Sequence, residues 1–248
     1  RPYAGNLNPT RPLRMPAKPA PQPRCAAVCV IDPYNGNVLY GYNANERRQV
    51  ASTQKIITAL CVCDAGDLDK LVTIHPTDRF SPRIRLGLRG GEKYTRRELL
   101  QAMLTGSFND VAISLARDCG GSVEGFVAKM NARARRMRMY NTHFANPHGL
   151  HNDDHYTTAH DIALIAAQAA QNEDICRIWG TMQYDIPPTN KNVLRNLWSQ
   201  VRMLDKNGNL YYQPCTGGKL GWTPEAKNTC VLVARQNGME LMCVLMGA

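Results

Sequence analysis

Long apolar segments are missing from this sequence. No uninterrupted apolar run approaches the roughly 20 residues that a helix needs to cross a bilayer, so we expect no membrane-spanning helix. No signal peptide is recognisable either, and because the sequence begins at Arg1 without a methionine, that absence carries no information about location. What remains is a chain of 248 residues with 44% hydrophobic residues. Such a chain can bury a sizeable core as one large domain or two small ones.

Cys-x-x-Cys pairs are also absent, which removes the basic unit of zinc ribbons and of redox motifs. Most cysteines lie inside apolar segments, where we expect buried thiols that act as small hydrophobic side chains. Their number is odd, so at least one is free or paired outside the chain, and in an oxidising compartment others could form disulfides that the sequence does not pair. The nine are Cys25, Cys29, Cys61, Cys63, Cys119, Cys176, Cys215, Cys230 and Cys243.

Acidic residues are few relative to basic ones. The 20 Asp and Glu against 30 Lys and Arg give a formal net charge of +10. This charge favours contact with nucleic acid, a membrane surface or an anionic cell-wall polymer, and does not choose among them. One basic run, at Arg133, Arg135, Arg136 and Arg138, lacks aromatic stacking partners, so we favour a solvated helix face over a nucleic-acid contact.

The first 24 residues contain no acidic residue at all. They hold seven prolines and five Arg or Lys, a composition that cannot bury a core or form a regular helix. We expect residues 1–24 to be a disordered, Pro-rich basic tether, either a passive leader or a linker near a membrane or cell wall. A single ordered domain is expected over 25–248.

The expected elements run in the order strands, helices, strands. Strands at 25–31 and 37–42 flank a turn, and the apolar runs 230–234 and 241–246 flank an Asn237-Gly238 hairpin signal. A second such signal, Asn207-Gly208, predicts another hairpin. Helices are expected over 52–64, 111–119, 123–139, 158–172 and 174–180, and from the capping box at 95–98. This order predicts an α/β (α+β) domain whose terminal strands meet in one antiparallel sheet.

Ser52 and Lys55 stand three residues apart at the expected start of a helix. Residues at that spacing share one helix face, so the Lys55 amine can lie near the Ser52 hydroxyl. A lysine with a lowered pKa can take the proton of a serine, which is otherwise a poor nucleophile. Ser-x-x-Lys is nevertheless common by chance, and two surface side chains are the plain alternative.

Five of the six histidines fall within 141–161. Metal binding has to be considered, because suitable donors are present in His148, His151, Asp153 and His155. Their spacing matches no His-Glu-x-x-His helix, and Pro147 and Gly149 interrupt the segment. We therefore favour a packed, hydrogen-bonded loop.

Three short motifs occur in a fixed order along the chain: 52–55 (Ser-Thr-Gln-Lys), 107–109 (Ser-Phe-Asn) and 219–221 (Lys-Leu-Gly). Taken together they resemble the penicillin-recognising serine enzymes, whose motifs are Ser-x-x-Lys, Ser-x-Asn and Lys-Thr-Gly. Within that superfamily the chain is similar to the D-alanyl-D-alanine carboxypeptidases, which are low-molecular-weight penicillin-binding proteins. The likeness covers about 25–248. Further stretches of family-like sequence lie at 51–60, 130–131, 142–150 and 155–159.

The resemblance implies a serine β-lactamase/DD-peptidase-like fold and an acyl-enzyme mechanism. Ser52 would be the nucleophile and Lys55 the general base, while Ser107 would relay protons to the leaving amine. Asn109 would bind the substrate backbone and help orient Lys55, and Lys219, on an edge strand, would supply positive charge. Backbone N–H groups of Ser52 and of Trp222, which follows Gly221, would hold the oxyanion.

The same resemblance implies partners and a location. The substrate would be a peptidoglycan peptide ending in D-Ala-D-Ala, β-lactams would be covalent inhibitors, and neither a metal nor an organic cofactor would be needed. A periplasmic or other extracytoplasmic, envelope-associated location would follow. The sequence ends at Ala248, before the closing helix and second domain that many relatives carry.

Three positions depart from the family pattern. Leu220 stands where the family has Thr or Ser, whose hydroxyl binds the terminal carboxylate of the substrate, and Phe108 stands where Gly is usual and could narrow the cleft. Lys191, between two asparagines, occupies the place of an arginine and would offer a point charge to that carboxylate instead of a bidentate fork. A β-lactamase or esterase on the same scaffold, or a catalytically weak protein that binds cell-wall peptide, therefore stay open as alternatives.

Overall fold

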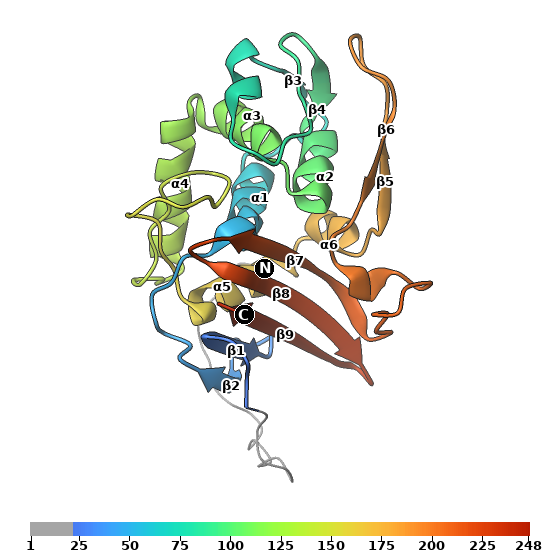
Figure 1. Cartoon of the computed structure of the whole chain (residues 1–248). Helices are drawn as coiled ribbons and strands as arrows, with labels where there is room; N and C mark the ends of the chain where they lie inside the picture. Colours follow the sequence, from blue (N-terminus) through green and yellow to red (C-terminus); the bar gives the residue numbers. More distant parts are fainter. Residues whose placement is uncertain (1–21) are drawn as a thin grey trace.

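The computed structural model describes residues 22–248, and the two ends of this stretch meet in one antiparallel sheet. The strand order is β2-β1-β9-β8-β7 (Figure 1). The strands are β1 (Ala27–Ile31), β2 (Val38–Tyr42), β7 (Cys215–Thr223), β8 (Lys227–Gln236) and β9 (Met239–Met246). The predicted joining of terminal strands is confirmed, because β1 pairs with β9 from Ala27↔Met246 to Ile31↔Met242. The predicted tether, 1–24, lies almost wholly outside the described residues, and the 25–248 domain boundary stays a prediction.

The helices gather between these strand groups in sequence and around α1 in space (Figure 1). They are α1 (Lys55–Asp64), α2 (Arg96–Gly106), α3 (Asn109–Gly120), α4 (Val123–Arg136), α5 (Ala159–Ala169) and α6 (Glu173–Trp179). All eight residues from Lys55 to Val62 are buried, as expected of a helix that is apolar all round and surrounded by other elements. The first residue of α1 therefore places a lysine inside the core.

Local sequence signals explain several helix ends. Thr95 accepts a hydrogen bond from the Glu98 N–H while the Glu98 carboxylate accepts from the Thr95 N–H, so the predicted capping box is confirmed. Thr158 likewise caps α5 by accepting from the Asp161 N–H. The helix predicted over 123–139 ends three residues early, at Arg136, and Met139 N–H instead bonds back to the Ala134 carbonyl.

One of the two predicted hairpins is confirmed and the other is wrong. Asn237 and Gly238, at φ 52° and 73°, form the two-residue turn between β8 and β9, where only residues that tolerate positive φ fit. Asn207-Gly208 instead lies in an irregular connection before β7, in which the Gly208 N–H bonds to the Asp205 carbonyl. The strands before and after it belong to different sheets, so the Asn-Gly turn had no partner strands to join.

Two small ribbons complete the described part of the chain. One pairs β3 (Leu71–Thr73) with β4 (Lys93–Thr95), and the other pairs β5 (Gln183–Ile186) with β6 (Arg195–Trp198). Both lie beside the helices at the end of the molecule away from β1 and β2 (Figure 1).

The histidine-rich stretch is a packed loop, as predicted. The buried His155 ring accepts from the Ala145 N–H, and the His143 ring bonds to the Asp154 carbonyl. Over residues 22–248, no group of three or more His, Cys, Asp or Glu side chains is arranged to hold a metal ion. Within the same residues, no helix is both long and apolar enough to cross a membrane.

The cysteines differ in burial more than the sequence suggests. All nine are free thiols, of which four are buried, four are half-buried and Cys176 is exposed. Desolvation raises the pKa of Cys29 and of Cys61 to about 12, so these thiols stay protonated. They act as small hydrophobic side chains.

Candidate active site

Ser52 and Lys55 meet as their spacing predicts, but on a tighter turn than an α-helix. Ser52 lies in a 3-10 helix, Ala51–Gln54, that leads directly into α1. Side chains three residues apart eclipse one another in a 3-10 helix, and the Lys55 Nζ lies 2.9 Å from the Ser52 Oγ. The helix expected over 52–64 is therefore a 3-10 helix as far as Gln54 and an α-helix from Lys55 onward. The tighter first turn aligns the two side chains.

The Lys55 ammonium has three oxygen neighbours. Besides Ser52 Oγ, it donates to the Asn109 Oδ1 at 2.8 Å and to the backbone carbonyl of His148 at 2.7 Å. An ammonium has three N–H donors, so these oxygens satisfy it fully. Two of them, an amide oxygen and a peptide carbonyl, can only accept. A neutral amine held by these two would direct its lone pair at Ser52.

Burial and charge both favour that neutral amine. Lys55 is 0% exposed, and desolvation holds its pKa well below the usual 10.5, while the positive charge of Lys219 lowers this pKa further. Burial also lowers the pKa of the His148 ring to about 3, so this neighbour stays neutral. Among the described residues, no acidic side chain forms an ion pair with Lys55 that would oppose these effects.

Ser107 and Lys219 form a second hydrogen-bonded pair. Lys219 comes from β7, at the edge of the sheet, and its Nζ lies 2.9 Å from the Ser107 Oγ and 2.7 Å from the Leu220 carbonyl oxygen. Burial lowers the pKa of Lys219 to about 7. Ser107 caps α2 in a left-handed conformation at φ 63°, a strained state for a non-glycine residue that is commonly found at functional sites.

Asn109 joins the serine-lysine pair to the wall of the site. It is the first residue of α3 and only 2% exposed. Its N–H donates to the Ile84 carbonyl at 2.7 Å and its Nδ2 to the Arg83 carbonyl, which leaves Oδ1 for Lys55. Because both ends of the amide are occupied, Asn109 orients the lysine and is more than a helix cap.

Strand β7 brings the third motif against Ser52. A Cβ atom on Gly221 would lie 2.7 Å from the Ser52 nitrogen and 3.0 Å from the Thr53 nitrogen, so only glycine permits this approach. Leu220 is half-buried and Trp222 is 61% exposed at the sheet edge. The oxyanion role expected of the Ser52 and Trp222 N–H groups stays a prediction.

Over residues 22–248, neither Phe108 nor Lys191 forms a hydrogen bond with Ser52. The Phe108 ring packs over Gly106, where an added Cβ would meet it at 2.1 Å, so the ring covers the end of α2. Lys191, in the connection between β5 and β6, donates from its Nζ to the Gly90 carbonyl. Their predicted roles in substrate binding stay predictions.

Two contacts at the site were missing from the sequence interpretation. The His148 carbonyl holds Lys55, and the Thr229 hydroxyl of β8 donates to the Val50 carbonyl at 3.0 Å, which ties the sheet to the turn that carries Ser52. Backbone carbonyls leave no signature in residue type, so the first contact could not be read from the sequence. Thr229 could have been found only once the register of β7 and β8 was known.

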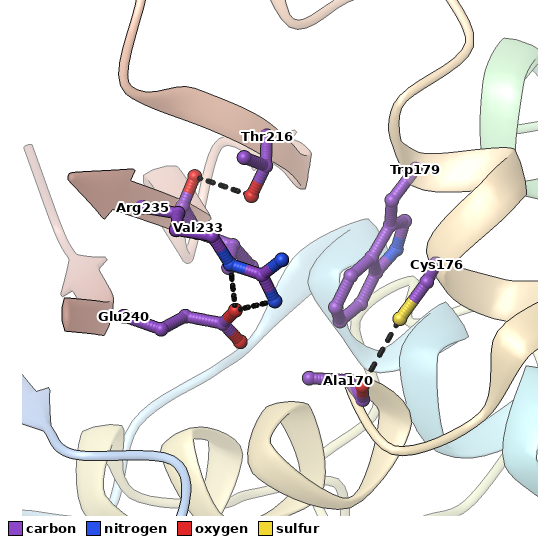
Figure 2. A pocket seen from close by; sticks show the side chains of 7 residues that line it. All are labelled: Ala170, Cys176, Trp179, Thr216, Val233, Arg235 and Glu240. Carbon is purple, nitrogen blue, oxygen red and sulfur yellow. Dashed lines mark hydrogen bonds and ion pairs between the residues drawn. The ribbon is translucent and has the colours of Figure 1, made fainter. Parts of the chain in front are cut away.

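A separate pocket lies between α6 and the ends of β7, β8 and β9. Its volume is about 160 Å³, and none of the residues placed at the Ser52 site lines it. Figure 2 shows that Glu240 faces Arg235 in this pocket, where the two side chains form an ion pair. The Cys176 thiol donates a hydrogen bond to the Ala170 carbonyl. The side chains that line this pocket do not reproduce the hydrogen-bonded pair of Ser52 and Lys55.

Comparisons with known proteins identify the family of the chain. A family model described as D-alanyl-D-alanine carboxypeptidase matches residues 15–248. The carboxypeptidase DacF of Bacillus subtilis is 32% identical over 225 residues, which are 88% of this chain and 56% of the relative. DacB2 of Mycobacterium tuberculosis is 32% identical over 230 residues, 92% of this chain and 76% of the relative. The chain thus spans little more than half the length of one of these relatives and about three quarters of the other.

Solved structures share the fold. A D-alanyl-D-alanine carboxypeptidase from Mycobacterium tuberculosis superposes with a TM-score of 0.86 at 31% identity, over 93% of this chain and 86% of that one. The Streptomyces K15 DD-transpeptidase gives a TM-score of 0.84 at 26% identity, over 93% and 92%. With the sequence matched from residue 15 to its end and the fold shared with DD-peptidases, the chain belongs to the D-alanyl-D-alanine carboxypeptidase family.

Proposed function

We propose that this protein is a serine-type D-alanyl-D-alanine carboxypeptidase that acts on peptidoglycan stem peptides through an acyl-enzyme on Ser52. The observation that carries the proposal is the Lys55 Nζ held between Ser52 and two fixed oxygen acceptors. Membership of the carboxypeptidase family supplies the substrate class.

The first step uses Lys55 as the general base. The neutral amine donates to Asn109 and His148, so its lone pair accepts the Ser52 proton as Oγ bonds to the penultimate D-alanine carbonyl carbon. The oxyanion that forms is stabilised by the Ser52 and Trp222 N–H groups, a contribution of about 3 kcal/mol for each donor.

Collapse of this intermediate breaks the C–N bond of the terminal residue. The Ser107 hydroxyl, hydrogen-bonded to Lys219, relays the proton that Lys55 took from Ser52: it gives its own proton to the departing amine and receives the one held by Lys55. D-alanine then leaves, the peptide stays as an ester on Ser52, and Lys55 is neutral again. Water then attacks the ester as Lys55 takes one of its protons, and Lys55 returns this proton to the Ser52 Oγ as the ester bond breaks, which frees a peptide shortened by one D-alanine. The positive charge of Lys219 favours the anionic groups that pass beside it.

Partners and location follow from the same chemistry. A β-lactam would acylate Ser52 as the peptide does, and the protein would work outside the cytoplasm, where peptidoglycan lies. Lys191 and Phe108 would border the bound peptide. These statements rest on the proposed reaction and on family membership.

A second candidate is a catalytically weak protein that holds cell-wall peptide in the same cleft. Leu220 favours this alternative, because an apolar side chain in the middle of the 219–221 motif donates no hydrogen bond to the terminal carboxylate. A β-lactamase or esterase would instead require rapid hydrolysis of the acyl-enzyme, and no described feature singles out that reaction.

Release of D-alanine from a peptide ending in D-Ala-D-Ala separates the candidates. We expect release by the wild type, none by Ser52→Ala, and wild-type release by Ser122→Ala, which changes a serine that caps α4 outside the site. Binding of the peptide without release by folded wild type would contradict the carboxypeptidase and support the binding protein.

A further inference from the structure

The segment after β3, up to and including the first residue of β4, carries five exposed basic side chains. They are Arg79, Arg83, Arg85, Arg89 and Lys93, called here the basic rim. Over residues 22–248, none of the five forms an ion pair with an acidic side chain. Such a group of unpaired cations favours an anionic partner.

The one acidic residue between Arg79 and Lys93 does not neutralise the rim. Glu92 is 0% exposed, and its carboxylate accepts from Tyr94 and Thr189 at 2.9 Å each and from Asn192. Arg195, outside the rim, lies 3.7 Å away from it. The Glu92 carboxylate is therefore satisfied by hydrogen bonds inside the protein, and it does not neutralise the exposed cations of the rim.

The backbone of the rim contacts the site at Asn109. The backbone carbonyls of Arg83 and Ile84 accept both hydrogen bonds of Asn109, and Asn109 contacts Lys55 at 2.8 Å. Only Asn109 therefore separates this part of the rim from the amine beside Ser52. The exposed Arg83 side chain starts from this backbone, which brings one cation of the rim to the border of the site.

The backbone that carries the rim is held in place. The Asp110 carboxylate is 0% exposed and accepts from the N–H groups of Leu86, Gly87 and Leu88 at 2.9 to 3.1 Å. Arg85 also donates to the Arg79 carbonyl at 2.8 Å. These contacts fix the loop beside α3, so its cations are presented at a defined place.

The geometry points to recognition, by the basic rim, of carboxylates that the substrate peptide carries outside its terminal D-Ala-D-Ala. This inference rests on the proposed function and specifies its substrate class, an acidic stem peptide with free side carboxylates. Guanidinium groups suit carboxylates because they donate two parallel hydrogen bonds. An anionic polymer without a cleavable peptide is the competing partner, and it would not distinguish peptides by their own charge.

Two peptides test the inference. Both end in D-Ala-D-Ala, and they differ only in whether their remaining side groups are carboxylates or carboxamides. For the wild type at low salt we expect kcat/KM to be about three- to tenfold higher for the acidic peptide than for the amidated one. This is the effect that one hydrogen bond between charged groups has at an exposed or partly buried position. In Arg83→Gln/Arg85→Gln, and for wild type in 0.5 M salt, this ratio should fall to about one.

A matched control uses cations elsewhere on the protein. Arg135 and Arg136 are exposed on α4, which contributes no residue to the site, and Arg135→Gln/Arg136→Gln should keep the wild-type ratio. Three outcomes would each overturn the inference. They are equal turnover of both peptides by the wild type, an unchanged kcat/KM ratio in the rim variant, and a control variant whose ratio falls as much as that of the rim variant.

Binding to Ser52→Ala separates this inference from the proposed function. We expect the acidic peptide to bind Ser52→Ala about three- to tenfold more tightly than the amidated one, and this preference should disappear in the triple variant with Arg83→Gln/Arg85→Gln. A binding preference without any turnover by the wild type would contradict the carboxypeptidase but support the rim. Equal affinity of Ser52→Ala for the two peptides would overturn the rim alone.

Discussion

Lys55 is the residue on which the proposed chemistry depends, because its protonation state decides whether Ser52 has a base. Burial and the charge of Lys219 both hold its pKa well below 10.5. Below the folded-state pKa the amine is an ammonium and cannot accept the serine proton. The rate of acylation should therefore fall as the pH falls through that value, and be regained as the pH rises through it.

Removing the charge of Lys219 should raise the pKa of Lys55. We expect the titration midpoint of the Lys55 Cε resonance, followed by NMR in protein with labelled lysine, to move upward in Lys219→Met. Lys206→Met, which removes an exposed lysine, should leave that midpoint unchanged. An unchanged midpoint in Lys219→Met would contradict the coupling between the two lysines.

Leu220 is the residue that we expect to limit recognition of the terminal carboxylate. In Leu220→Thr a hydroxyl would be available to the terminal carboxylate, and a hydrogen bond to a charged group is worth about 1.5–3 kcal/mol. We expect kcat/KM for a peptide ending in D-Ala-D-Ala to rise about 10- to 100-fold. Leu220→Val, with a β-branched side chain but no hydroxyl, should give no such gain. An equal rate in Leu220→Thr and Leu220→Val would show that this position does not read the carboxylate.

At the scale of elements, the site is held by contacts between the turn at Ser52 and the loop at His148. Gly149, at φ +88°, packs so closely on this turn that an added Cβ would lie 2.0 Å from the Ala51 carbonyl oxygen. The preceding residue, His148, holds Lys55 through its own carbonyl. Any shift of this loop therefore moves an acceptor of the base.

Gly149→Ala should reduce both stability and acylation. We expect a loss of about 2 kcal/mol or more in the free energy of unfolding, from the left-handed backbone and the clash together, with a parallel loss of acylation rate. Gly66→Ala is the matched control, since Gly66 also has positive φ but has no atom near its Cβ position, so about 1–2 kcal/mol and an unchanged acylation rate are expected. Full acylation in Gly149→Ala would contradict the positioning role of the loop.

Local chemistry made some elements predictable and others not. The capping box at Thr95 and the Asn237-Gly238 turn each satisfy backbone groups within a few residues, so their residue types reveal them. Asn207-Gly208 carries the same turn signal but lacks paired strands on its two sides. The 3-10 turn at Ser52 packs against Gly149, nearly one hundred residues away, and no local sequence pattern contains this contact.

At the scale of the whole molecule, the site exists because distant segments converge on α1. Ser52 and Lys55 lie at its start, Asn109 on α3, and Lys219 on the edge strand β7. The meeting of these residues could be expected only from the resemblance to a family, because spacing within a chain does not report distance in space. Contacts made by backbone carbonyls, such as that of His148, had to come from the structure.

The proposed function depends on Ser52 as an acylating nucleophile that Lys55 activates. Mass spectrometry of the folded protein after incubation with a penicillin tests it most directly. We expect one covalent adduct on the wild type, mapped to the peptide that contains Ser52, and none on Ser52→Ala, with a strongly slowed reaction in Lys55→Met. No adduct on folded wild type, or an adduct on another residue that persists in Ser52→Ala, would contradict the account.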